Sequence, residues 1–96
     1  MNTIIKPIPI KVDVGRLYAT VNAMASLEAE DVADCLVRHL SGDWGDVDEH
    51  DQMANDLALD QCHRIVSVYT DRHGVRFWIV TEADRSRTTI LLPMDY

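Results

Sequence analysis

The sequence predicts an α+β fold: a three-stranded antiparallel β-meander plus an N-terminal strand or arm, with two to three helices packed on one face. Three short runs rich in β-branched and aromatic residues lie between His63 and Pro93, and polar turns separate them, which is typical of a meander. Amphipathic segments in the first half of the chain predict the helices. A chain of 96 residues is long enough for one domain, residues 1–96, with one modest core.

The first two strands of the meander are expected at residues 64–70 and 75–81. The connection between them, residues 71–74, begins with aspartate and ends with glycine, which tight turns favour at those positions. A four-residue connection pairs Val68 with Phe77 across the two strands, and this register decides which side chains share a face.

A third strand is expected at residues 87–92, because Pro93 cannot extend a ladder of backbone hydrogen bonds. A four-residue connection before it places Ile90 on the same face as Ile79. The opposite face, which carries Trp78, is expected to be partly apolar and to point outward; its other apolar members are Ile65, Tyr69, Val80 and Leu91.

The N-terminal half begins with residues 6–14, whose period-two alternation predicts a strand or an extended arm. Pro7 and Pro9 have no N–H to donate, so this segment belongs at a sheet edge or in an arm that lies over the domain. A further short strand is expected at residues 16–20. Helices are expected at residues 22–30, 31–40 and 48–60, with Asn22, Asp31 and Asp48 as their N-caps.

Negative charge is concentrated in one segment of the chain. The formal net charge is -7, and residues 43–60 contain seven acidic residues and neither Lys nor Arg. A solvated helix face explains this segment as well as an anionic surface for a basic partner does. If the segment binds a partner, the expected contact residues are Asp43, Trp44, Asp46, Asp48, Glu49, Asp51 and Asp56, with Trp44 as the hydrophobic anchor.

Several other classes of function are not expected. The chain has no basic stripe that could neutralise phosphates, which disfavours direct binding of nucleic acid. It has neither a signal-peptide pattern nor an apolar run of the roughly 20 residues that a membrane span needs, so we expect no membrane association and a cytoplasmic protein. Cys35 and Cys62 fit no disulfide framework, and Cys35 is expected as a buried thiol.

No cofactor or metal is expected either. The chain contains no P-loop, no GxGxxG turn and no GxSxG motif. The acids that follow Asp46 do not match the EF-hand loop, because its sixth position is Asp51 and its twelfth is Leu57. The four histidines and two cysteines have no zinc-ligand spacing.

A second polar cluster lies in residues 81–89, where Glu82, Asp84, Arg85 and Arg87 stand close together in the sequence. Such a set could form the small active site of a nuclease or toxin. It could equally form a hydrogen-bonded turn in which the acids pair with the arginines. We favour the turn, because charge-rich connections between strands are common, and we assign no catalytic residue.

Residues 31–96 resemble a group of short bacterial proteins that are encoded on plasmids and other mobile elements. The stretches GDWGDVDEHD, ANDLAL and RIVSVY carry the resemblance, and TEADRSRTTILLP is its most specific part. The group has no established chemistry, so the resemblance transfers no catalytic residue. It implies a setting among the accessory genes of mobile DNA, where small inhibitors of host defence and small regulators are frequent.

Three hypotheses follow. The first is a small acidic accessory protein that binds the basic surface of a defence or nucleic-acid-handling complex and blocks it, as an anti-CRISPR or anti-restriction inhibitor would. The second is a small enzyme that uses the cluster in residues 82–89. The third is a structural homodimer formed through the outer sheet face. We favour the first, because the acids are clustered and the resemblance points to mobile elements.

Overall fold

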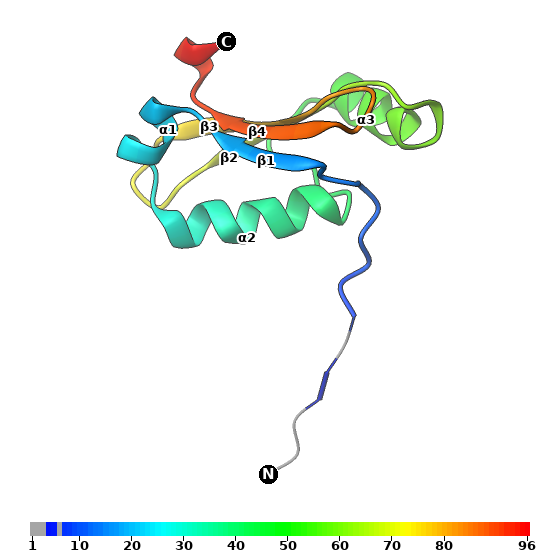
Figure 1. The fold of residues 1–96 in the computed structure, drawn as a ribbon, viewed down its shortest axis with the longest axis horizontal. Helices are drawn as coiled ribbons and strands as arrows, with labels where there is room; N and C mark the ends of the chain where they lie inside the picture. The colour runs from blue at the N-terminus through cyan, green and yellow to red at the C-terminus, as the bar shows by residue number, and fades with distance from the viewer. Residues whose placement is uncertain (1–3, 6) are drawn as a thin grey trace.

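The computed structural model describes residues 4–5 and 7–96. In this part of the chain, strands and helices follow one another as β1 (Arg16–Ala19), α1 (Val21–Ser26), α2 (Ala29–Leu40), α3 (Glu49–Gln61), β2 (Ile65–Thr70), β3 (Arg76–Thr81) and β4 (Arg87–Leu91), and a 3-10 turn, η1 (Pro93–Asp95), comes last (Figure 1). The predicted α+β class is confirmed.

The four strands form one mixed sheet in the order β1-β4-β3-β2. The predicted meander is confirmed, because β2 pairs with β3 and β3 pairs with β4, both antiparallel. The predicted short strand at residues 16–20 is present as β1, and it runs parallel to β4. The three antiparallel strands of the prediction are therefore extended by a fourth, β1. In the resulting sheet β1 forms one edge and β2 forms the other.

The predicted register between β2 and β3 is wrong by one residue. Val68 lies opposite Trp78, and Tyr69 lies opposite Phe77. The cause is the turn, because the Asp71 carboxylate accepts hydrogen bonds from the N–H groups of His73 (3.0 Å) and Val75 (2.9 Å). Val75 thus belongs to a five-residue connection, and each side chain of β2 moves to the other face.

The register between β3 and β4 has the predicted faces. Ile79 lies opposite Ile90, and Trp78 lies opposite Leu91. Because of the slip in β2, Ile65 and Tyr69 join Phe77 and Ile79 on the covered face, where all four are buried. Ile65 and Tyr69 were wrongly expected on the outer face.

Local sequence explains where the helices begin. The Thr20 hydroxyl caps α1 by accepting from the N–H of Ala23, so this helix starts one residue earlier than expected. Asp48 caps α3 as predicted, with its carboxylate accepting from the N–H of Asp51. Asp31 was wrongly predicted as a cap, because α2 begins two residues before it. Its carboxylate instead binds Arg72, and the hydrogen bond from that guanidinium holds the pKa of Asp31 below its usual value.

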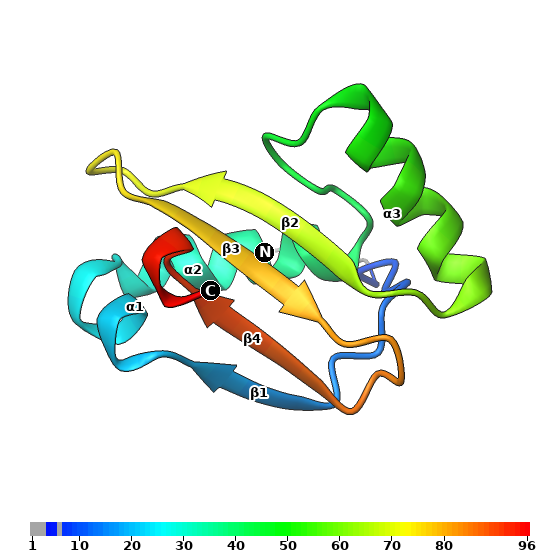
Figure 2. The ribbon, with the colours of Figure 1, turned by 90° about the horizontal axis from the view of Figure 1, so that it is seen from above.

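The helices do not all pack on one face of the sheet, which corrects the prediction. Helix α2 lies under the sheet, and α3 lies beside β2 at the edge, as Figures 1 and 2 show. The larger core cluster lies between the sheet and α1 and α2; its buried members are Ala23, Cys35, Tyr69, Phe77, Ile79, Ile90 and Leu92. A smaller cluster joins α3 to the sheet through Val12, Trp44, Ala58 and Ile65.

The N-terminal segment, predicted at residues 6–14 as a strand or arm, contains no strand among its described residues. Its base is fixed, because Val12 is buried and the N–H groups of Lys11 and Val12 donate to the carbonyl of Leu40 at the end of α2. Residues 7–10 leave the domain beyond that point, as Figure 1 shows. We call residues 7–10 the arm.

Candidate functional site

The acidic segment, residues 43–60, forms the loop before α3 and most of that helix. Three of its carboxylates have structural roles. Asp43 pairs with Arg38 at 2.8 Å, and this contact holds the pKa of Asp43 below its usual range. Asp48 caps α3, and Asp56 accepts the indole N–H of Trp44 at 2.8 Å. These three residues support the fold whether or not they also meet a partner.

Trp44 is not the predicted hydrophobic anchor for a partner. Its side chain is only 2% exposed and packs edge-on against His39, with 5.8 Å between ring centroids. The N–H of Val68 donates to the carbonyl of Trp44, and the N–H of Asp46 donates to the carbonyl of Val68. Trp44 therefore belongs to the core, and its loop covers part of the edge of β2.

The apolar side chains that α3 does expose are Met53 and Leu57, which are 68% and 51% exposed. Met53 and Leu57 recur at helical spacing with Ala54 and Ala58, a pattern that favours the inner side of the helix. The inner side is instead formed by Asn55 and Ala58, which are buried. We call the outward surface of α3 the α3 stripe; at helical spacing it contains Glu49, Met53, Asp56, Leu57 and Asp60.

Most acids of this region lack a cationic partner. Among the described residues, Asp43 is the only acid of residues 43–60 that forms an ion pair. Asp46, Glu49, Asp51 and Asp60 are exposed. No group of three His, Cys, Asp or Glu side chains in the described part of the chain is arranged to hold a metal ion.

The alternative site, Glu82, Asp84, Arg85 and Arg87, is a hydrogen-bonded turn. The N–H of Arg85 donates to the Glu82 carbonyl, and the Asp84 carboxylate accepts from the N–H of Ser86. The Arg85 guanidinium donates to the carbonyls of Ala58 (2.8 Å) and His63 (2.7 Å), so it satisfies the C-terminal end of α3. Glu82 lies 3.7 Å from Arg64, while Arg87 is exposed.

The side chains of this turn therefore contact main-chain groups and Arg64 rather than a shared cleft, and among the described residues the acids of the turn do not pair with Arg85 and Arg87 as expected. Only a shallow, open depression lies over the turn, lined by Glu82, Ala83, Asp84, Ser86 and Arg87. The guanidinium that the enzyme hypothesis needs is bound to two main-chain carbonyls, which leaves that hypothesis without a supporting observation.

A buried polar chain runs beneath the sheet and was missed by the sequence analysis. His39 contacts Ser67 through Nδ1 (2.6 Å) and Thr81 through Nε2 (2.8 Å), and Thr81 contacts Thr88 at 2.7 Å. The Thr88 hydroxyl donates to the Val14 carbonyl. Because that carbonyl only accepts, Thr88 must accept from Thr81, and Thr81 must accept from the Nε2–H of His39.

The neutral His39 ring then accepts from Ser67 at Nδ1, and every member of the chain is satisfied. Burial, with a smaller contribution from the charge on Arg85, lowers the pKa of His39 to about 4. The side chain is 0% exposed, so Ser67 and His39 cannot meet a substrate and the pair is structural.

The outer sheet face, predicted as a dimer surface, is partly covered by the C-terminal residues. Tyr96 packs edge-on against Trp78, with 5.2 Å between ring centroids, and the Arg64 guanidinium lies 5.0 Å from the Tyr96 ring. Val80 and Leu91 on this face are buried. The proposed homodimer through this face therefore loses most of its apolar contact area.

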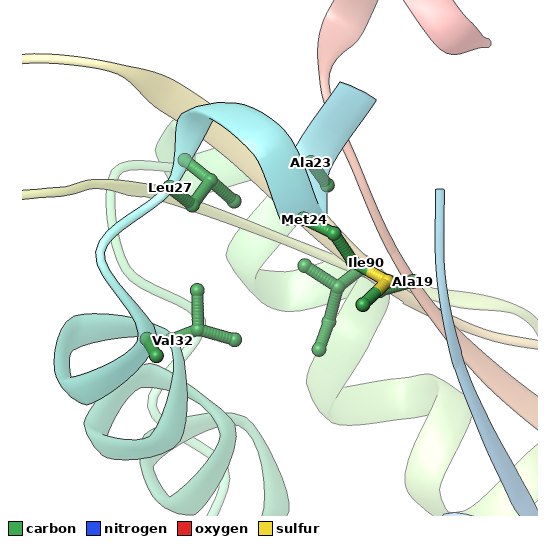
Figure 3. Close-up of a pocket in the computed structure, with 7 residues that line it drawn as sticks. Ala19, Ala23, Met24, Leu27, Val32 and Ile90 are labelled. Carbon is green, nitrogen blue, oxygen red and sulfur yellow. The ribbon is translucent and has the colours of Figure 1, made fainter. Parts of the chain in front are cut away.

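A different apolar surface is open on the side of β1. A pocket of about 210 Å³ lies between α1, α2 and the sheet, with almost entirely apolar walls. Figure 3 shows Leu27 and Val32 on one side of it and Met24 and Ile90 on the other. Met24 is 75% exposed, although it is a large apolar residue. The short run Ala23–Met24–Ala25 gave no signal for this pocket, because it forms only when α1 packs beside β4.

No helix among the described residues combines the length and the apolar character that crossing a membrane requires. Comparison of the chain with protein-family models, with curated proteins and with solved structures finds no match.

Proposed function

We propose that this chain is a protein-binding accessory protein that meets a basic surface of its partner through the α3 stripe and the neighbouring acids. The observation that carries the proposal is the uncompensated charge of residues 43–60, where six of seven acids form no ion pair with another described residue. Asp48 and Asp56 serve the fold through hydrogen bonds, whereas the other four acids form neither an ion pair nor a side-chain hydrogen bond with another described residue; these four are Asp46, Glu49, Asp51 and Asp60.

The apolar side chains within the acidic surface support a protein partner. Met53 and Leu57 lie one turn apart on α3, and the acids Glu49, Asp56 and Asp60 flank them. Interfaces commonly combine a small apolar centre with a charged rim that guides the encounter. We therefore expect the partner to present lysines or arginines around a hydrophobic depression.

The resemblance to mobile-element proteins suggests a concrete form of this function. A small acidic protein can occupy a basic surface that a restriction or CRISPR complex uses for nucleic-acid phosphate, and so prevent the complex from acting. Binding alone is enough for inhibition by occlusion, so this proposal requires neither a cofactor nor a catalytic residue.

The test is a charge reversal on α3 that leaves the structural acids unchanged. The variant Glu49→Lys/Asp60→Lys changes the surface charge at both ends of the stripe, and neither residue forms a side-chain hydrogen bond among the described residues. In a pull-down from a bacterial lysate at low salt, we expect this variant to lose the proteins that the wild-type chain retains. Establishment of a plasmid in a restricting host, if the wild-type chain improves it, should fall in parallel.

The matched control is Asp34→Lys on α2, an exposed acid that forms no ion pair among the described residues, compared with the single variant Asp60→Lys, which changes the net charge by the same amount. We expect Asp34→Lys to behave as wild type. A second variant, Met53→Ser/Leu57→Ser, tests the apolar contacts while keeping every charge. Equal retention of the same proteins by all variants would refute the proposal.

A further inference from the structure

The strand β1 has a free edge. At its two ends, the N–H groups of Arg16 and of Thr20, the next residue after the strand, donate to the carbonyls of Ser86 and Ile90 on the β4 side. Because the groups of a strand alternate in direction, the N–H and C=O groups of Leu17 and Ala19 point away from β4. No described residue pairs with them across that edge, which lies outermost in the sheet order.

The opposite edge of the sheet is protected. There, the backbone of Val68 pairs with Trp44 and Asp46, and the side chain of Asn55 pairs with the backbone of Val66. An exposed strand edge usually carries charges, a proline or a covering segment. The edge of β1 has none of these at Leu17, Tyr18 and Ala19, so it can accept a further strand.

The arm has the pattern that this edge requires. Ile8 and Ile10 alternate with Pro7 and Pro9, so the only N–H groups within the arm belong to the two isoleucines. In an extended strand both groups point to the same side, toward one neighbour. The arm can therefore pair along one edge only, and its proline side would end the sheet.

The side chains of the arm fit the same arrangement. In an antiparallel pair, residues that exchange hydrogen bonds also place their side chains on the same face. Isoleucines paired with Leu17 and Ala19 would thus point to the α2 side of the sheet, where Ala19 lines the apolar pocket (Figure 3). Ile8 and Ile10 are 52% and 62% exposed in the single chain, so burying them there is favourable.

The arm of the same chain does not reach this edge. The residues that join it to β1 are held elsewhere, because Val12 is buried against Trp44 and Ile65, and the Val14 carbonyl accepts from Thr88. Folding the arm back onto β1 would break these contacts. The arm also leaves the domain on the α2 side in Figure 1, away from its own β1.

Charge favours an arm from a second copy. Residues 1–11 contain two lysines and no acid, whereas the remaining residues contain seven arginines and sixteen acids, a balance of -9. The lysines that flank the arm, Lys6 and Lys11, make this end of the chain cationic, and a cationic segment is attracted to the anionic body of another molecule. A basic partner of the kind that would meet the α3 stripe has the wrong sign to replace it.

We propose that two copies of this chain exchange arms, each arm adding an antiparallel strand to the free edge of β1 in the other copy. Ile8 pairs with Ala19 of the other copy and Ile10 with Leu17, and the isoleucine side chains cover the apolar pocket between α1 and α2. The reciprocal exchange is closed by a two-fold axis, as expected for an isologous dimer. The α3 stripe, at the other edge of the sheet, stays accessible in both copies.

Sedimentation of the full chain over micromolar to submillimolar concentrations should show a monomer–dimer equilibrium. The full-length variant Ile8→Ser/Ile10→Ser should weaken the dimer at least about a hundredfold, because four buried isoleucines are lost per dimer. The matched control Ile4→Ser/Ile5→Ser changes the same residue types past the end of β1 and should dimerise as wild type. A monomer at all concentrations, or a dimer that the first variant leaves unchanged, would overturn the proposal.

Disulfide trapping tests the register. Cysteines at Ile8 and Ala19, in a chain with Cys62→Asn, should give a covalent dimer on mild oxidation, since hydrogen-bonded antiparallel pairs lie about 5.5 Å apart between Cα atoms and disulfides span that distance. Cysteines at Pro9 and Ala19 should not cross-link, because their side chains would lie on opposite faces. Equal cross-linking by both pairs would contradict the proposed pairing, and a monomeric disulfide would show that the arm folds back on its own chain.

Discussion

The side-chain amide of Asn55 pairs with the backbone of Val66 as a neighbouring strand would. Its Nδ2 donates to the Val66 carbonyl at 2.8 Å, and its Oδ1 accepts from the Val66 N–H at 3.3 Å. Asn55 thereby satisfies the backbone groups of Val66 at the edge of β2, and the loop around Gly45 satisfies those of Val68. One polar residue on the inner side of α3 both docks the helix and protects the sheet.

The first prediction is that Asn55→Ala destabilises the protein by about 1–3 kcal/mol, because it leaves a donor and an acceptor of Val66 without partners. The measurement is the midpoint of urea denaturation. Gln52→Ala, at an exposed position of the same helix, is the control and should stay within about 0.5 kcal/mol of wild type. A midpoint for Asn55→Ala equal to that of the control would show that water replaces the amide without loss.

The second prediction compares two glycines that share a left-handed backbone. Gly45 has φ +73° and Gly74 has φ +82°, so alanine is strained at both. At Gly45 the added methyl group would overlap with the Val68 carbonyl oxygen and the Tyr69 ring, whereas at Gly74 it meets no atom within 4 Å. We expect Gly74→Ala to cost about 1–2 kcal/mol and Gly45→Ala clearly more, because the loop must leave β2.

Thermal unfolding of the two glycine variants, followed by circular dichroism, measures this difference. Equal losses would mean that backbone strain alone matters and that the loop of Gly45 is not held against β2. A larger loss at Gly74 would contradict the close approach at Gly45 altogether.

The sequence predicted which segments form helices and strands, but not all of their boundaries or the partners of individual side chains. Asp48 caps α3 as expected, because an N-cap contacts only the next turn of its own chain. The register of β2 failed, because the Asp71 carboxylate draws one more residue, Val75, into the turn. A single residue of turn length moved Tyr69 from the expected outer face into the core.

The candidate site shows the same division. The exposure of the acids in the segment was predicted, because charged side chains are rarely buried unless they are paired. Trp44 was predicted as an anchor within the acidic segment, yet it is buried in the cluster that contains Val12, Ala58 and Ile65, and Asp56 satisfies its indole N–H. Nothing in the spacing of α3 indicated that Asn55 would face inward and Met53 outward, because the amide finds its partner on β2.

The third prediction concerns Arg85, which the enzyme hypothesis and the structure treat differently. If the guanidinium serves only the end of α3, Arg85→Ala should lower the free energy of unfolding by about 1.5–3 kcal/mol, as expected for hydrogen bonds from a charged group. Arg87→Ala, whose side chain is exposed in the same turn, is the control. Growth arrest of cells that express the folded wild-type chain, lost with Arg85→Ala at full stability, would revive the enzyme hypothesis.

The fourth prediction is that His39 makes stability depend on pH in the mildly acidic range. The pKa of His39 is lowered to about 4 in the folded protein, chiefly by burial, whereas its ordinary value is 6.5. Between these values the unfolded chain takes up a proton that the folded protein excludes, so acidification favours unfolding. The stability that depends on neutral His39 is complete above pH 6.5 and is lost progressively as the pH falls to about 4.

The expected loss over this range is about 3 kcal/mol, from the difference between the two pKa values. Urea denaturation at several pH values measures it, and His39→Gln should flatten the curve whatever its stability at neutral pH. The pKa of Asp71 is lowered chiefly by the hydrogen bond from the N–H of Val75, so the contribution of such acids to the stability of the protein is also lost on acidification. Because the acids are common to both proteins, the difference between the two curves isolates His39, and parallel curves would mean that the buried ring accepts a proton without breaking its chain of hydrogen bonds.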